Sequence, residues 1–115
     1  MTQEERQLLL KDLCARLLYG VKVYGNFRYG SDEEIIEDAR VTTLDLECLD
    51  WLMNGIEVKP YLRPMSSMTE EERMELSNYE NTIQRADFFY SHHLDPRNLI
   101  EKGFALPAPD GMYDN

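Results

Sequence analysis

The fold of this chain is decided in residues 56–75, IEVKPYLRPMSSMTEEERME, where an alternating segment gives way to a helical one. At the start of this stretch every second side chain is apolar, which is the period of a half-buried strand: Ile56, Val58 and Leu62. Pro60 and Pro64 cannot donate to a sheet ladder, so the strand should lie at a sheet edge or end early. We therefore expect a third strand over residues 56–62.

A helix is expected to begin directly after this strand. Thr69 is followed three residues later by Glu72, which is the pattern of a capping box. In this motif the threonine side chain accepts a hydrogen bond from the backbone N–H of the glutamate, and the glutamate accepts one from that of the threonine. Carboxylates in the first turn also interact favourably with the positive end of the helix dipole. Residues 56–75 thus predict a change from a sheet-forming half of the chain to a helical half.

The composition predicts a single globular domain over residues 1–115, because 43% of the residues are hydrophobic and 30% are charged. The formal net charge of −10 argues against direct binding to nucleic acid, which requires a basic surface, and against an anionic membrane. Residues 1–5 are acidic and polar, unlike a secretory signal. No apolar run approaches the ~20 residues that span a bilayer. We therefore expect a cytoplasmic protein without nucleic-acid or membrane partners.

The first forty residues predict a helix followed by a hairpin. Residues 2–18 carry a second capping box, Thr2 with Glu5, and an apolar stripe at helical spacing. The residues expected on the buried side are Leu9, Leu10, Leu13, Cys14 and Leu17, and those expected in water are Glu4, Arg6, Lys11 and Arg16. From Val21 to Tyr29 the period changes to two, which predicts a strand. One face of this strand would carry Val21, Val23, Gly25, Phe27 and Tyr29. A turn at Gly30-Ser31-Asp32 would lead into a returning strand over residues 34–43.

The remaining elements are expected to be short helices. Residues 44–54 fit a helix that ends at Asn54-Gly55, with Trp51 half-buried on its rim. An exposed helix over residues 70–79 has Met74 as its clearest apolar anchor, and a break follows near Ser77-Asn78 or Asn81. The next helix covers residues 82–94, with a buried side made by Ile83, Ala86, Phe89, Tyr90 and His93. Asp95 and Pro96 would open a last helix to Lys102, and Phe104 and Leu106 would pin the tail.

Together these elements predict the fold class: α+β, with an N-terminal helix, a small antiparallel sheet of about three strands and a C-terminal cluster of short helices.

The cluster with metal-ligand chemistry is His92, His93 and Asp95, since imidazole and carboxylate suit zinc or iron. Adjacent side chains on a helix point about 100° apart, and Asp95 is needed as a cap. We therefore expect no metal site. Instead, His93 should pack against Phe89, Tyr90 or the Leu99–Ile100 turn, and His92 should face solvent.

No catalytic or cofactor-binding residue is expected elsewhere in the chain. Cys14 and Cys48 lie in apolar segments and form no Cys-x-x-Cys pair, which indicates reduced, inert core thiols. The serines lack a Gly-x-Ser-x-Gly context, and the glycines are too scattered for a phosphate loop. The carboxylate run over residues 32–38 lacks the order of a calcium loop and is read as a solvated turn and strand face.

Several strings resemble a family of small uncharacterised proteins encoded in phages, prophages and mobile elements of gut bacteria. They are Lys59-Pro-Tyr-Leu-Arg-Pro-Met-Ser-Ser-Met-Thr-Glu-Glu-Glu72, His92-His93-Leu94-Asp95 and Leu99-Ile100-Glu101-Lys102-Gly103, together with Lys11–Arg16 near the start and Ala108–Tyr113 near the end. Many relatives read Asp-Tyr-Arg-Gly where this chain has Asp95-Pro96-Arg97-Asn98, so no role for that turn is carried over. The resemblance implies a genomic setting and no activity.

These observations favour a non-enzymatic accessory protein of a phage or mobile element that acts by contact with a host or phage protein. An alternative is an acidic DNA mimic that blocks a nucleic-acid-binding protein. A continuous negative face would support mimicry, and an even scatter of carboxylates would not. A second alternative is a metal-dependent enzyme, which would need His92 and His93 to converge on a carboxylate.

Overall fold

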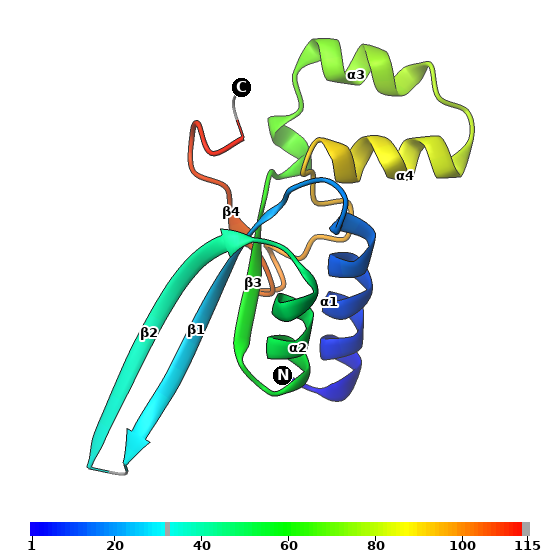
Figure 1. Cartoon of the computed structure of the whole chain (residues 1–115). Coiled ribbons are helices and arrows are strands. Elements are labelled where there is room, and N and C mark those ends of the chain that lie inside the picture. The colour runs from blue at the N-terminus through cyan, green and yellow to red at the C-terminus, as the bar shows by residue number, and fades with distance from the viewer. Residues whose placement is uncertain (32, 114–115) are drawn as a thin grey trace. The chain divides into compact units, whose positions relative to one another are not determined.

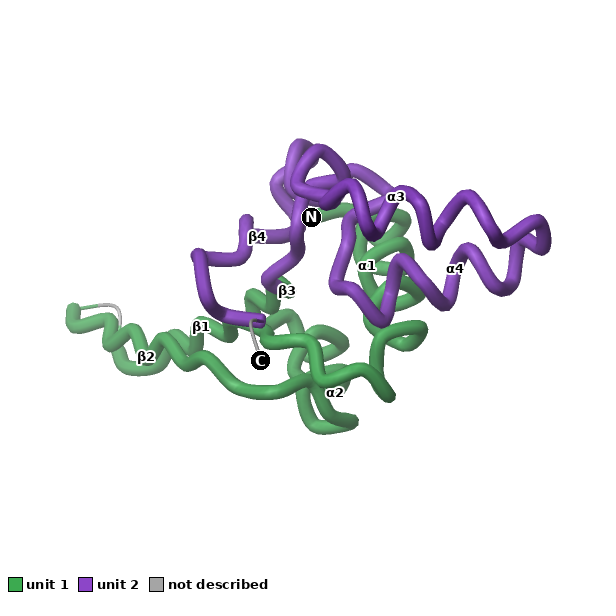
Figure 2. Tube along the Cα trace, turned by 90° about the horizontal axis from the view of Figure 1, so that it is seen from above, with its two compact units in different colours: residues 1–60 green, residues 61–115 purple. Residues whose placement is uncertain are grey.

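The computed structural model describes residues 1–31 and 33–113. The chain divides into two compact units, residues 1–60 and 61–115, which Figure 2 shows in separate colours. The described elements, in chain order, are α1 (Gln3–Arg16), β1 (Lys22–Ser31), β2 (Glu34–Thr43), α2 (Leu46–Met53), β3 (Glu57–Leu62), the 3-10 helix η1 (Met65–Ser67), α3 (Glu70–Ser77), α4 (Thr82–Ser91) and β4 (Leu106–Pro107). The fold class is α+β with an N-terminal helix, as the sequence predicts.

The sheet differs in detail from the expected three-stranded antiparallel one. Its described strands are four, hydrogen-bonded in the order β2-β1-β3-β4. β1 pairs antiparallel with β2 and with β3, but β3 pairs in parallel with β4, so the sheet is mixed. The missed strand β4 is only two residues long and has no period of its own, and its pairing with a distant strand leaves no local trace in the sequence.

In the first unit, α1 begins at the expected capping box. Thr2 Oγ1 accepts a hydrogen bond from Glu5 N at 3.1 Å, and Glu5 accepts one from Thr2 N at 2.8 Å. The buried side of the helix, however, is formed by Leu9, Asp12, Leu13 and Arg16. The expectation that Arg16 faces water and Cys14 is buried was wrong, because Arg16 forms an ion pair with Asp12 one turn away and both side chains are buried.

The hairpin of β1 and β2 has the expected strands, paired from Lys22 opposite Thr43 to Ser31 opposite Glu34. Gly30 and Ser31 belong to β1 rather than to the turn, and Asp32 lies outside the described residues. The predicted short helix follows as α2, with the Asp45 side chain accepting from Cys48 N at 3.0 Å. Asn54 is the C-cap of this helix, as expected. Gly55 follows with a φ of +83°, which lies in the left-handed region that favours glycine.

β3 is the strand that the two prolines constrain, and it belongs to both units. Residues 57–60 pair with β1, and residues 61–62 pair with β4. The strand is therefore not at a sheet edge, but it does end early, two residues before Pro64. Pro60 is tolerated because the ladder to β4 begins only after it, at Tyr61.

In the second unit, α3 begins at the expected capping box of Thr69 and Glu72, with hydrogen bonds of 3.1 and 2.9 Å. The break before α4 is confirmed, with Asn81 as the N-cap of α4. The expected apolar anchors were partly wrong, because Met74 is exposed and Ile83 is 71% exposed. The buried residue of α4 is Phe88, whose ring contacts those of Tyr79, Phe89 and His92.

The helix expected from Asp95 to Lys102 does not form, and the chain makes successive turns there instead. Asn98 has a φ of +58°, which interrupts a right-handed helix. Asp95 is buried and closes this loop: its two carboxylate oxygens accept hydrogen bonds from Leu99 N and Ile100 N, both at 2.9 Å. An N-cap side chain accepts from the backbone N–H two or three residues further on, whereas the donors to Asp95 lie four and five residues further on. Asp95 therefore does not act as the expected N-cap.

Candidate interaction site

The hairpin of the first unit has an end that we call the arm, residues 27–31 of β1 and 34–38 of β2. The β3 ladder covers only residues 23–26 of β1, so within the described chain the two arm segments pair only with each other. Figure 1 shows the hairpin extending well beyond α1 and α2 of the same unit. Beyond Phe27, the arm therefore presents two faces that the helices of its own unit do not cover.

Three apolar side chains of the arm are exposed to solvent. Tyr29 is 55% exposed, Ile36 is 44% exposed and Ile35 is 67% exposed. Tyr29 and Ile36 oppose each other and so share one face, whereas Ile35 lies on the other face. Tyr29 was expected on the buried face with Val21 and Val23. This was wrong, because the strand extends beyond the core before it reaches Tyr29.

The base of the arm is held by aromatic packing within the same unit. The ring of Trp51 in α2 meets Phe27 edge-on, with centroids 4.8 Å apart and planes at 82°. Gly25 lies under the same ring: a Cβ built there would be 3.4 Å from Trp51, at van der Waals contact. The guanidinium of Arg40 covers the Phe27 ring at 5.0 Å. These contacts fix the orientation of the base of the arm relative to α2.

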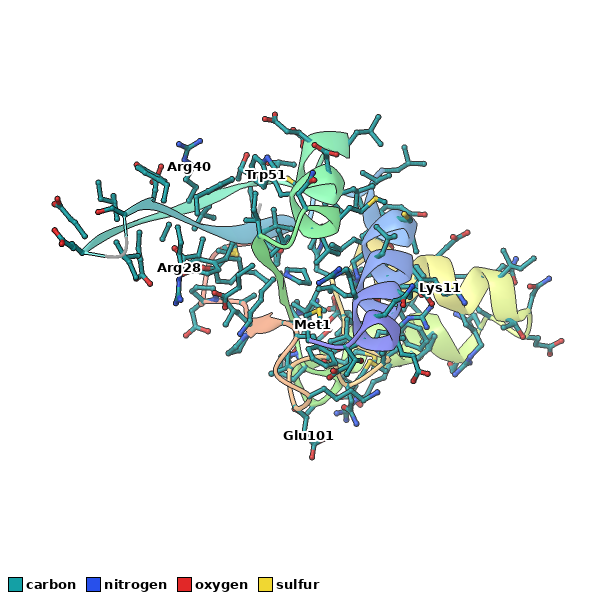
Figure 3. The ribbon with its side chains drawn as sticks, turned by 90° about the horizontal axis from the view of Figure 1, so that it is seen from below. Met1, Lys11, Arg28, Arg40, Trp51 and Glu101 are labelled. Carbon is teal, nitrogen blue, oxygen red and sulfur yellow. The ribbon has the colours of Figure 1, made fainter. Side chains whose placement is uncertain are left out.

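The described residues of the arm carry one cation, Arg28, and the three carboxylates of Glu34, Glu37 and Asp38. Arg28 forms an ion pair across the strands with Glu37 at 2.9 Å, and Arg40 forms one with Asp38 at 2.6 Å. Figure 3 shows Arg28 and Arg40 pointing to opposite sides of the hairpin. The hydrogen bonds that Arg40 donates to the Asp38 carboxylate raise the pKa of Arg40. Two of the carboxylates in the acidic 32–38 run are thus partnered by arginines.

In the second unit the charged residues form a structural network around Arg63. The guanidinium of Arg63 binds both carboxylate oxygens of Glu72, at 2.8 and 2.7 Å, and reaches the backbone oxygens of Ser67 and His92. Because Arg63 donates to it, the pKa of Glu72 is lowered to about 2. The network ties the start of α3 to the end of α4. Arg63 also lines a hollow of about 420 Å³ with Tyr113 and residues 107–111, but its guanidinium is already committed to Glu72.

The two histidines take different partners. His92 faces solvent only in part: its side chain is 34% exposed, its ring packs on Phe88 at 4.3 Å and its Nδ1 lies 3.0 Å from Glu72. His93 has a φ of +61° and stacks on Tyr113 at 3.8 Å and 18°. No contact was expected for Tyr113, because a lone aromatic in a Pro- and Gly-rich tail gives little signal in the sequence. In the described part of the chain, no group of three or more His, Cys, Asp or Glu is placed to hold a metal ion.

The two cysteines differ in environment. Cys48 is buried, and burial raises the pKa of its thiol to about 11. Cys14 is exposed, which corrects the expectation of two core thiols.

We therefore expect the exposed thiol of the native protein to react readily with a disulfide reagent, and the buried one to react only on unfolding, since the thiolate is the nucleophile. Stopped-flow labelling of the wild-type protein and of Cys14→Ser measures this. The Cys14→Ser variant should lose the fast phase and keep the slow one. A fast phase that survives in Cys14→Ser would contradict the buried, protonated state of Cys48.

No family model, no curated protein and no solved structure matches this chain. None of the described helices has the length and the apolar character that crossing a membrane requires.

Proposed function

We propose that this protein is a non-enzymatic accessory protein of a phage or mobile element, and that it acts by contact with a host or phage protein through its arm. The observation that carries the proposal is the exposure of Tyr29, Ile35 and Ile36 on strand segments that pair only with each other among the described residues. Burying such a side chain from full exposure is worth about 1.5–3 kcal/mol, and covering the 44–67% still exposed here is worth roughly half of that. Exposed apolar side chains gathered at one end of a hairpin favour association, so a physiological partner for them is a coherent explanation.

The arm is also preorganised for binding. Its base is fixed by the packing of Trp51 on Phe27, and its strands are joined by the Arg28–Glu37 ion pair. A surface that is ordered before binding loses less conformational entropy when a partner docks. This supports a role as a recognition element rather than as a loop that merely connects two strands.

The alternatives gain less from the structure. A DNA mimic needs a continuous run of negative charge, whereas on the hairpin Glu37 and Asp38 each have an arginine partner. A metal-dependent enzyme needs His92 and His93 to converge, whereas their rings lie against Phe88 and Tyr113 respectively. Protein contact through the arm therefore remains the function that the geometry supports best.

The test compares Ile35→Asp with Ile83→Asp, a matched control, because Ile83 is equally exposed but lies on α4 of the second unit. Each full-length chain is immobilised and exposed to lysate of a gut bacterium, and bound proteins are identified by mass spectrometry. A purified candidate is then titrated against all three chains by calorimetry. We expect a partner that binds wild type and Ile83→Asp equally and Ile35→Asp at least about tenfold more weakly. A partner that binds Ile35→Asp as tightly as wild type would overturn the role of the arm.

A further inference from the structure

We infer that a second copy of this chain pairs with β2 along its outer edge, antiparallel and about a two-fold axis at Ala39. This inference goes beyond the proposed function, because it uses the backbone edge of β2 rather than the side chains at the end of the arm. The two ideas can therefore fail separately.

The outer edge of β2 is available for pairing. β2 stands at the end of the strand order, and in the part of the chain that the structure describes it pairs only with β1. It is ten residues long and contains neither proline nor glycine. A strand edge of this kind presents backbone donors and acceptors that another strand can use. Charged residues are the usual protection of such an edge, so their arrangement on β2 decides whether a copy can bind.

Symmetry limits the registers that two copies of β2 can adopt. In a two-fold antiparallel pair, opposed residues lie on the same face of the joined sheet. Side chains alternate between faces along the strand, so even-numbered residues must oppose even-numbered ones and odd must oppose odd. The axis then passes through a residue rather than between two residues, and that residue opposes its own copy.

Charge selects one of these registers. An axis at Glu37, Asp38 or Arg40 places a charged residue opposite itself, and an axis at Ile36 places Glu34 opposite Asp38 of the copy. Like charges directly opposite are destabilising. An axis at Ala39 instead places Asp38 opposite Arg40 of the copy, twice by symmetry. An axis at Val41 brings no charged pair into register and pairs only residues 39–43.

The register at Ala39 also extends an interaction that already exists. Within one copy Asp38 binds Arg40 at 2.6 Å, and these side chains are 32% and 59% exposed. In the paired state each aspartate would lie beside an arginine of its own strand and opposite one of the copy. An isolated surface ion pair contributes little, but an alternating cluster of four charges contributes more. The same register places Ile35 opposite Thr43 and Ile36 opposite Thr42, which is free of clashing charge.

The expected dimer is weak and reversible, because one strand per copy makes a contact at the small end of specific interfaces, which is below about 1,200 Å² in total. Sedimentation equilibrium of the full chain from micromolar to millimolar concentration measures it. Four variants accompany the wild type: Arg40→Asp, Asp38→Arg, the double exchange of both, and Arg28→Asp. Arg28→Asp changes the net charge by the same amount as Arg40→Asp and also removes an ion pair of the hairpin, but it lies on β1. Tryptophan fluorescence confirms that each variant is folded.

We expect Arg40→Asp and Asp38→Arg each to weaken association at least about tenfold, and the double exchange to restore it to within about threefold of wild type. Arg28→Asp should associate as wild type does, apart from the small effect of added net charge. Wild-type protein that stays monomeric at every concentration would overturn the inference. A dimer that Arg40→Asp and Asp38→Arg leave intact would also overturn it, as would equal losses in Arg40→Asp and Arg28→Asp. Association is measured on the purified chain alone, so the partner test with Ile35→Asp is decided by a separate experiment.

Discussion

Replacing Arg16 by methionine is expected to lower the free energy of unfolding by about 3–5 kcal/mol. The Asp12 and Arg16 side chains are both 0% exposed, and Arg16 Nε lies 2.7 Å from Asp12 Oδ2. A second hydrogen bond, from the Arg16 terminal nitrogen to Asp12 Oδ1, measures 3.2 Å. Removal of the arginine leaves a carboxylate that is buried without its cation. The cost is the desolvation of that charge rather than the value of the pair itself.

Urea denaturation followed by the fluorescence of Trp51 measures this effect, since Trp51 is the sole tryptophan and lies in the same unit. Two controls define the cause. Lys11→Met, an exposed cation of the same helix, should change stability by less than about 0.5 kcal/mol. The double variant Asp12→Leu with Arg16→Met should be more stable than Arg16→Met alone, because no charge is then left buried. A point mutation ordinarily changes the free energy of unfolding by roughly 1 kcal/mol. If Arg16→Met lowers it by no more than that, the buried Asp12 carboxylate does not depend on Arg16 for its stability.

Replacing Glu72 by glutamine is expected to remove roughly 3 kcal/mol of stability at neutral pH. The Arg63 guanidinium lowers the pKa of Glu72 from an ordinary 4.5 to about 2, and this difference converts to that free energy. The folded state holds the proton less tightly than the unfolded state does. The stabilisation is therefore complete above pH 4.5, declines as the pH falls from 4.5, and is almost absent at about pH 2.

The measurement is denaturation of wild type and Glu72→Gln at a series of pH values, followed by far-ultraviolet circular dichroism because the second unit contains no tryptophan. The stability difference between them should be constant above about pH 5 and shrink below it. Glu71→Gln is the matched control, since Glu71 is exposed in the same helical turn. Its effect should be a few tenths of a kcal/mol and nearly independent of pH. A difference for Glu72→Gln that does not change between pH 5 and pH 2 would mean that the Arg63 pair does not perturb this carboxyl.

Local signals explain why much of the fold could be predicted from the sequence. A capping box is complete within four residues, so both Thr2 with Glu5 and Thr69 with Glu72 were readable before any packing was known. The hairpin was readable because its alternation persists over two strands. By contrast, the pairing of Leu106 with Tyr61 depends on a contact across 45 positions, which no local pattern records.

The misplaced residues share another cause. Arg16 looks like a water-facing residue until its buried partner Asp12 is seen, and a charged residue is rarely buried unless paired. On α4, Ile83 and Phe88 are both apolar, and only the packing of the unit shows that Phe88 is the buried one. The arm was predicted as strands but not as a surface. An alternation of apolar and polar residues predicts a strand, but it does not tell whether other elements cover one face of that strand. At Tyr29 neither face is covered.

The division of β3 between two neighbours sets an order of events during protein synthesis. The β1 ladder needs only residues up to Pro60, whereas β4 begins at Leu106, 46 residues later. At roughly 5–20 residues per second, a ribosome takes about 2–9 s to add them. For that interval the second edge of β3 has no partner in the nascent chain and could capture a strand of a neighbouring polypeptide. Pro60 takes one N–H donor away from this edge, so a residue inside the strand protects the chain while it is still being made.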